Sequence, residues 1–316
     1  MNPIRLIYFG TSEFAVPALR ALLDRPELFD VAAVVSQPDR PAGRKGEMKT
    51  SPVAGVAREL GLTLLQPESL KKGGAVDELK ELDADVFVVA AYGQIIPKVI
   101  LDIPKRGALN LHGSLLPKHR GASPIQTAIL EGDGATGVTL MVMDEKMDHG
   151  PLLSKLVVEI DPEDDYPSLL DKLADSAAQL IVEDLLKFIA GELEAHEQDH
   201  DSATYTKILK KKDGLIDWTA EGAESMERRV RAFTPWPGTC TTLARKDGEL
   251  RLKILWAEAV SKPEQGMKPG QIAVSKDGFP IIAAERGALK LLEVQPDGRR
   301  PMSGDAFLRG YPDILA

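Results

Sequence analysis

The first half of the chain alternates short apolar runs with segments whose apolar residues recur at helical spacing. The runs predict strands at residues 4–9, 31–35, 62–66, 86–91, 108–112, 137–143 and 152–160, with the last as an antiparallel candidate. Helices are predicted at 12–25, between Pro52 and Gly61, at 75–82 and at 166–189. Strands that alternate with helices favour right-handed βαβ units. We therefore expect an α/β domain with a Rossmann-like, mostly parallel sheet.

The pattern changes after residue 190. A polar linker is expected at 191–210, followed by one helix at 219–233. Short β-rich runs then occur at 240–243, 250–257, 271–274, 280–283 and 289–294, with turn residues between them. This spacing is typical of a small barrel of the oligonucleotide-binding (OB) type. The expected organisation is a Rossmann-like domain at 1–190, a linker at 191–210 and a C-terminal OB-like β-barrel domain at 211–316.

Composition narrows the class of protein. The 316 residues include one cysteine, so an internal disulfide and a Cys-rich zinc site are both excluded. One cysteine also fits a reducing compartment. No apolar run approaches the ~18 residues that a membrane-spanning helix needs. We therefore expect a cytoplasmic protein.

The net charge of −9 is divided unevenly along the chain. Residues 1–206 carry −13, and much of this lies in 150–206, whereas residues 207–316 carry +4. An acidic protein repels nucleic-acid phosphates, but a change of sign along the chain also marks a domain boundary. The net charge therefore excludes only a uniformly basic nucleic-acid binder.

The residues around two familiar motifs argue against the functions that these motifs usually indicate. The first βα turn, Gly10-Thr-Ser-Glu-Phe14, has one glycine and an acid where a dinucleotide site needs three glycines around a pyrophosphate. His196-Glu-Gln-Asp-His200 matches the zinc-protease pattern, which works only on a helix. Because it follows Gly191 in the polar linker, we interpret it as a coincidence and expect no metal.

The most informative stretch is Asn110-Leu-His-Gly-Ser-Leu-Leu-Pro117, followed by Arg120-Gly-Ala-Ser-Pro-Ile-Gln126. Asn110 and His112 lie two residues apart near the end of a strand, so both side chains leave the same face. Ligands collect at the carboxyl ends of strands in open parallel sheets. An amide at such a place can stabilise an oxyanion, and an imidazole can move a proton. This pair is therefore a candidate for acyl-transfer chemistry.

A second element, Met143-Asp-Glu-Lys-Met-Asp148-His-Gly150, follows a later strand. Either Asp144 or Asp148 can orient His112 and stabilise its charge, as the third group of a catalytic triad does. The alternative is a turn aspartate that caps backbone amides. We expect His149 to be an exposed loop histidine.

Taken together, these segments resemble the folate-dependent formyltransferase family over essentially the whole chain. The loop Gln37-Pro-Asp-Arg-Pro-Ala-Gly-Arg44 and the segment Phe233-Thr-Pro-Trp-Pro-Gly238 are similar to the tRNA-formylating members of that family. The resemblance implies transfer of the formyl group of 10-formyltetrahydrofolate, a co-substrate, to the amino group of methionyl initiator tRNA in translation initiation. It also implies a monomer that needs neither a metal nor a membrane.

The resemblance also implies roles for individual residues. The catalytic residues are Asn110, His112 and Asp148. The folate-binding residues are Ser114, Leu115, Leu116, Pro117, Phe87, Ala90, Tyr92 and Gly93, with sheet core as an equal alternative for Phe87 to Ala90. The tRNA-binding residues are Arg40, Arg44, Lys45, Lys49, Lys207, Lys210, Lys211 and Arg228, with ordinary surface charge as the alternative. Trp218 and Trp236 are expected to pack rather than to stack on bases.

Two other functions stay open at this level. One is the same transfer to a small amine, such as an amino sugar nucleotide, which would leave the basic loop at 36–51 and the basic C-terminal domain without a purpose. The other is folate or RNA binding without turnover, against which the complete trio of Asn110, His112 and Asp148 argues.

Overall fold

The computed structural model describes residues 2–42, 46–71, 74–246, 248–261 and 266–315. It forms two compact units. The first comprises Met1–Pro124, Ala135–Glu159 and Leu170–Lys207, and the second comprises Ile125–Gly134, Ile160–Leu169 and Ile208–Ala316. Among the described residues, no helix combines the length and the apolar character that crossing a membrane requires.

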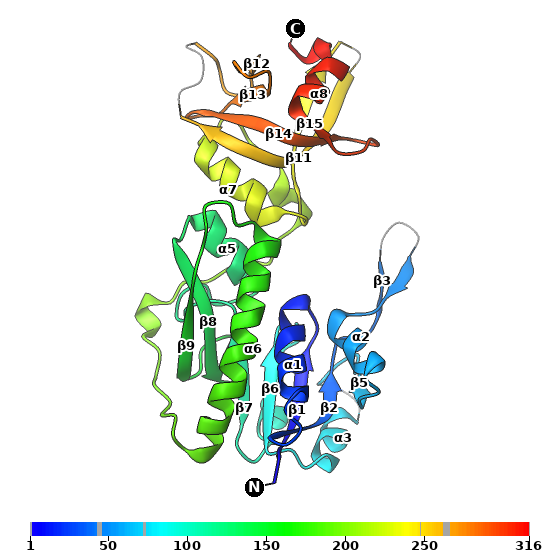
Figure 1. Cartoon of the computed structure of the whole chain (residues 1–316), viewed down its shortest axis with the longest axis vertical. Helices are drawn as coiled ribbons and strands as arrows, with labels where there is room; N and C mark the ends of the chain where they lie inside the picture. The colour runs from blue at the N-terminus through cyan, green and yellow to red at the C-terminus, as the bar shows by residue number, and fades with distance from the viewer. Residues whose placement is uncertain (1, 43–45, 72–73, 247, 262–265, 316) are drawn as a thin grey trace. The chain divides into compact units, whose positions relative to one another are not determined.

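The first unit is built on a seven-stranded sheet in the order β5-β2-β1-β6-β7-β8-β9 (Figure 1). Its strands are β1 (Ile4–Gly10), β2 (Phe29–Val35), β5 (Leu64–Leu65), β6 (Val86–Ala90), β7 (Ala108–His112), β8 (Ala135–Val142) and β9 (Leu152–Glu159). The first five strands in sequence pair in parallel, which confirms the Rossmann-like, mostly parallel sheet. Both β8 and β9 are antiparallel to their neighbours, whereas the sequence pattern suggested this only for β9.

Helices α1 (Val16–Leu23), α2 (Pro52–Glu59), α3 (Ala75–Glu81), α4 (Lys98–Leu101) and α6 (Tyr166–Ala190) accompany this sheet. Figure 1 shows α1 and α6 in front of the strands. The predicted helix signals are confirmed, because the Ser51 side chain caps α2 by accepting from the Ala54 N–H at 3.1 Å. Gly191 follows α6 with φ +75°, a left-handed conformation suited to glycine. Leu79 and Ile100, from α3 and α4, pack into one core with the strand residues.

The described part of the segment 36–51 contains two short strands where we expected a polar loop. It contains β3 (Arg40–Ala42) and β4 (Glu47–Lys49), which pair antiparallel and extend away from the large sheet (Figure 1). Neither strand has the alternating apolar pattern by which a strand is usually predicted. Arg44 and Lys45 lie outside the described residues.

The second unit contains an antiparallel sheet in the order β10-β11-β14-β13-β12, with β15 paired to β14. The strands are β10 (Thr239–Arg245), β11 (Gly248–Val260), β12 (Ile272–Val274), β13 (Pro280–Ala283), β14 (Ala288–Pro296) and β15 (Met302–Ser303). Helices α7 (Ala223–Phe233) and α8 (Gly304–Gly310) pack against it, with Met226 and Phe307 fully buried in a shared core. The predicted small barrel-like domain is thereby confirmed.

Details of the second unit differ from the sequence prediction. Helix α7 begins four residues later than predicted, because Asp217 accepts hydrogen bonds from the backbone and hydroxyl of Thr219 and closes a turn instead. Trp218 is buried and donates its Nε1–H to Thr241 Oγ1 at 2.9 Å, as expected for a packing residue. Trp236 was also predicted to pack, but it is 54% exposed.

Candidate active site

Strand β7, between β6 and β8, presents Asn110 and His112 on one face of the first unit's sheet, since they are alternate residues of the same strand. Asn110 is half-buried and His112 is buried. Across the described part of the chain, the Asn110 side-chain amide has no hydrogen-bond partner. An amide held on a strand with both N–H groups unused is available to a ligand.

Each ring nitrogen of His112 faces an oxygen atom of the protein. Its Nε2 lies 3.0 Å from the carbonyl oxygen of His119. Because a carbonyl can only accept, Nε2 must carry a hydrogen in this arrangement. Its Nδ1 lies 3.5 Å from Oδ1 of Asp148, a distance that allows charge attraction but is long for a hydrogen bond. The ring is thereby oriented with a carboxylate facing its second nitrogen.

Asp148, not Asp144, is the carboxylate that faces His112. Asp148 has φ +50°, an uncommon conformation for a non-glycine residue, and its Oδ2 accepts from the Gly121 N–H at 2.7 Å. Asp144 instead lies 2.6 Å from Nδ1 of His149. His149 was predicted to be exposed, but it is half-buried and stacks on His200 with ring centroids 4.0 Å apart.

The predicted folate loop, Ser114–Pro117, is held from β8 and β9. Thr139 accepts from the Leu116 N–H at 3.1 Å and donates to the Ser114 carbonyl at 2.6 Å. Lys155 donates to the Leu116 carbonyl, and partial burial lowers the pKa of this lysine. Three backbone groups of the loop are thus satisfied by two side chains, which fixes its shape before any ligand arrives.

The same loop lies close against β8. A Cβ atom at Gly137 would lie 2.2 Å from the Leu156 carbonyl oxygen and 2.6 Å from Cδ2 of Leu115. Only glycine allows this approach. Within the predicted folate loop, Ser114 and Leu116 are fully buried, whereas Leu115 and Pro117 are half-buried.

The other predicted folate residues differ in exposure. Phe87 and Ala90 are fully buried, and the Phe87 ring lies 5.1 Å from that of Phe9 within the core, which favours the packing alternative for Phe87. Tyr92 is buried, its hydroxyl has no partner among the described residues, and burial raises its pKa to about 12. Gly93 is exposed, with φ +84° beside the Gln37 side chain. A folate contact for each of the four stays a prediction.

The predicted tRNA-binding residues that the structure describes are mostly exposed. Exposed positions are Arg40, Lys49, Lys207, Lys210 and Lys211. Arg228 differs, because it is half-buried and its Nε donates to the Leu130 carbonyl at 3.0 Å. The contact gives Arg228 a structural role within the second unit.

Two buried residues near the site escape sequence reasoning. Arg120 is 1% exposed and Gln198 is 5% exposed, and their side chains are hydrogen-bonded to each other. The sequence shows Arg120 only as part of a motif. Gln198 lies inside the zinc-like pattern, whose first histidine, His196, pairs with Leu152 in an extended bridge rather than on a helix. The helix that a zinc site of this type requires is therefore missing from these described residues.

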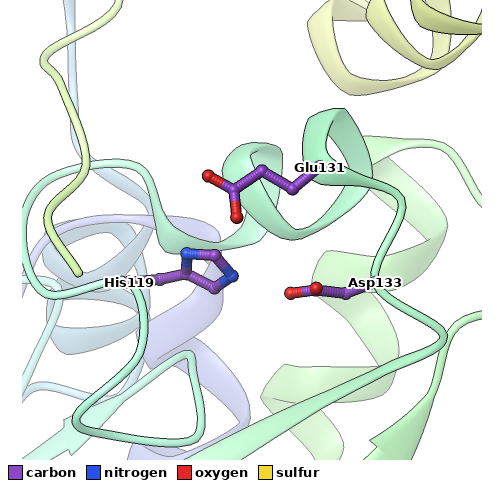
Figure 2. A group of neighbouring side chains, drawn as sticks. All are labelled: His119, Glu131 and Asp133. Atoms are coloured by element: carbon purple, nitrogen blue, oxygen red, sulfur yellow. The ribbon is translucent and has the colours of Figure 1, made fainter. Parts of the chain in front are cut away.

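Taken unit by unit, the described residues offer no group of three His, Cys, Asp or Glu side chains spaced to share a metal ion. Figure 2 labels His119, Glu131 and Asp133. His119 follows β7 in the first unit, and the two acids lie at and just after the end of α5 (Pro124–Glu131) in the second. We infer no metal site from residues of different units.

Comparison with known proteins agrees with this arrangement. The formyl transferase family model matches residues 4–185, and the model of the formyl transferase C-terminal domain matches residues 208–312. The methionyl-tRNA formyltransferase of Chloroflexus aggregans is 44% identical, over 98% of this chain and 99% of its own length. That of Geobacter metallireducens is 42% identical, over 98% and 96%.

The fold is also similar to that of HypX from Aquifex aeolicus, solved in complex with tetrahydrofolic acid. The TM-score is 0.63 at 15% identity, and the match covers 98% of this chain. This chain spans about half the length of HypX, since the match covers 47% of that protein. With both family models matched in order and full-length relatives above 40% identity, the chain belongs to the formyl transferase family.

Proposed function

We propose that this chain transfers the formyl group of 10-formyltetrahydrofolate to the free amino group of methionyl initiator tRNA. The observation that carries the proposal is the Asn110 amide, which has no partner among the described residues and lies on the same strand as His112, with Asp148 of a later loop facing His112. The names of the full-length relatives support the acceptor, because they are methionyl-tRNA formyltransferases. We further propose that the protein acts in the cytoplasm as a monomer.

Asn110 takes the electrostatic role in the proposed reaction. When the amine attacks the formyl carbon, the formyl oxygen becomes negative. The Asn110 amide donates a hydrogen bond to this oxygen, and such a donor contributes about 3–4 kcal/mol in comparable acyl transfers. Because no described residue is hydrogen-bonded to this amide, it meets the developing charge without first breaking a bond to any of them.

The His112–Asp148 pair takes the proton-handling role. The attacking amine must lose a proton, and N10 of the departing folate must gain one. We assign the proton in transit to the pair rather than to either residue, because Nε2 of His112 already donates to the His119 carbonyl. The side that can exchange a proton lies between Nδ1 and Oδ1 of Asp148, 3.5 Å apart.

We propose that the folate rests on the loop Ser114–Pro117, with Tyr92 and Gly93 at the next strand end. The fixed loop supports this assignment, because a rigid apolar surface suits flat rings. On the acceptor side, Arg40 and Lys49 of the β3–β4 hairpin and the lysines at 207, 210 and 211 are proposed phosphate contacts, since all are exposed.

The test is an assay of the purified protein with 10-formyltetrahydrofolate and methionyl initiator tRNA, with formylmethionyl-tRNA as the product measured. Initiator tRNA should react faster than elongator methionyl-tRNA or a small amine. Asn110→Ala should lower kcat by about 10²- to 10³-fold, because the oxyanion loses its donor. Faster transfer to a small amine would contradict the proposed acceptor. Normal turnover by an Asn110→Ala, His112→Ala double variant would contradict the mechanism.

A further inference from the structure

The loop that carries Asp148 is held from the segment that follows α6. Gln198 donates through Nε2 to the carbonyl oxygens of Asp148 at 3.0 Å and of Gly150 at 2.8 Å. Both N–H groups of this one buried amide are therefore bonded, one to the residue before His149 and one to the residue after it. Since Asp148 is in a left-handed conformation, its backbone needs external support to stay there.

The other end of Gln198 is fixed by Arg120. Its Oε1 accepts from Arg120 Nη2 at 2.6 Å and from Nε at 3.2 Å. The guanidinium also contacts Nδ1 of His200 at 2.9 Å and the Tyr205 hydroxyl at 3.3 Å. No carboxylate lies within ion-pair distance of Arg120 among the residues that the structure describes.

A buried cation with only neutral partners is costly, so proteins seldom keep one for packing alone. Here it orients one amide. Arg120 is followed directly by Gly121, whose N–H binds the carboxylate of Asp148. The same short stretch of chain thus supports Asp148 twice, directly at the carboxylate and through Gln198 at the backbone.

We propose that Gln198 and Arg120 are positioning residues for the formyl transfer, which hold the Asp148 carboxylate opposite His112. The inference rests on the proposed function of the chain. It gives a purpose to the segment 196–206, whose Thr204 and Thr206 backbones also bond to the Arg120 backbone. The segment that resembled a zinc site therefore holds the loop that carries Asp148 in place.

The deciding variant is Gln198→Glu. A glutamate keeps the acceptor for Arg120 and adds charge to that contact, so the buried cation gains a partner. It loses both N–H donors and places a carboxylate oxygen against the two carbonyls of the Asp148 loop. We expect kcat to fall by about 10- to 100-fold with little change in KM for either substrate, because the reacting groups are misplaced rather than removed.

Gln295→Glu is the matched control, since Gln295 also donates to a backbone carbonyl, that of Arg299 at 2.8 Å, in the second unit. It should keep the wild-type kcat. Hydrogen exchange of the peptide covering 144–150 should rise in Gln198→Glu and not in the control. A merely structural role would lower stability without this local change.

The decisive comparison uses the Asp148→Ala background. If Gln198 acts through Asp148, Gln198→Glu should cost no further activity there. An equal loss in both backgrounds, or wild-type kcat in folded Gln198→Glu, would overturn the inference. Should Gln198→Glu fail to fold, the same measurements are made on Gln198→Asn, whose side chain is too short to reach both Arg120 and the Asp148 loop. The same results would then support or overturn the inference. If the wild-type chain forms no formylmethionyl-tRNA, the proposed function fails instead.

Discussion

Two segments of the first unit are proposed to meet substrate, and they are built differently. The loop after β7, residues 113–123, is held by buried or partly buried hydrogen bonds with the side chains of Thr139, Lys155 and Thr204. The β3–β4 hairpin carries exposed residues and is anchored at its base by Asp39. Groups that must meet a reacting atom gain from being fixed in advance, whereas charges that attract phosphates act over a distance from solvent.

The largest effect expected from this contrast is on stability. Thr139→Val keeps the shape of a fully buried side chain but leaves the Leu116 N–H and the Ser114 carbonyl unpaired. Each unsatisfied buried group costs about 1–3 kcal/mol, so for the two groups we expect a loss of about 2–6 kcal/mol in the free energy of unfolding. Urea denaturation measures it, and the KM for the folate should rise as the loop loosens.

The same strand offers a matched control. Thr136 is 2% exposed, and its hydroxyl has no hydrogen-bond partner in the described structure. Thr136→Val should therefore leave stability unchanged or raise it. Equal losses in the two variants would mean that the loop is not held by Thr139, and the contrast with the hairpin would disappear.

The residues that sequence reasoning found are those whose roles follow from local spacing. Asn110 and His112 share a face because strand residues alternate, and this needs no knowledge of the fold. Spacing alone left the choice between Asp144 and Asp148 open, and only the family resemblance favoured Asp148, because the choice depends on a left-handed turn at Asp148 and on its contact with Gly121. Local patterns do not encode such contacts.

Gln198 and Arg120 could not be found from the sequence for a different reason. Gln198 and Arg120 are 78 positions apart, and among the described residues neither has a charge partner that a pattern could reveal. The fold class was easier, because β-rich runs and helical periods extend over many residues. The hairpin was missed because Arg40–Ala42 and Glu47–Lys49 are too short and too polar to show a period of two.

A smaller effect is expected when hairpin charge is removed. Arg40→Ala with Lys49→Ala should weaken tRNA binding and make the slope of log affinity against log salt shallower by about 1 for each phosphate that is no longer neutralised. Stability should not change, since the ion pair of Arg40 with Glu68 at 3.3 Å is exposed on both sides. Binding titrations across salt concentrations provide the measurement.

Lys80→Ala removes an exposed lysine from α3 and serves as the control, with no expected change in the salt slope. If the hairpin variant keeps the wild-type slope of log affinity against log salt, the phosphate-binding residues must lie elsewhere. A loss of stability in that variant would show that the hairpin is held as firmly as the loop after β7, which would remove the contrast between the two segments.

The smallest effect is expected at the base of the hairpin. Asp39 accepts hydrogen bonds from Gln66 and Arg58, both at 2.9 Å, and from Thr50 at 3.1 Å. The bond from Gln66, followed by that from Arg58, holds the pKa of Asp39 below its usual value. A carboxyl whose pKa is lowered in the folded state stabilises the fold at pH values above its unfolded-state pKa of about 3.9. This contribution is lost as the pH falls through the folded-state pKa.

Asp39→Asn should therefore be less stable than the wild type at pH 7, and the difference should shrink as the pH falls below about 3.9. Asp175→Asn, which removes an exposed carboxylate of α6 that has no hydrogen bond in the described structure, should show no such dependence. Urea denaturation between pH 7 and pH 3 measures both. If the deficit of Asp39→Asn stays constant over this range, the carboxylate charge is not what anchors the hairpin, and its bonds to Thr50 and Gln66 must act through shape alone.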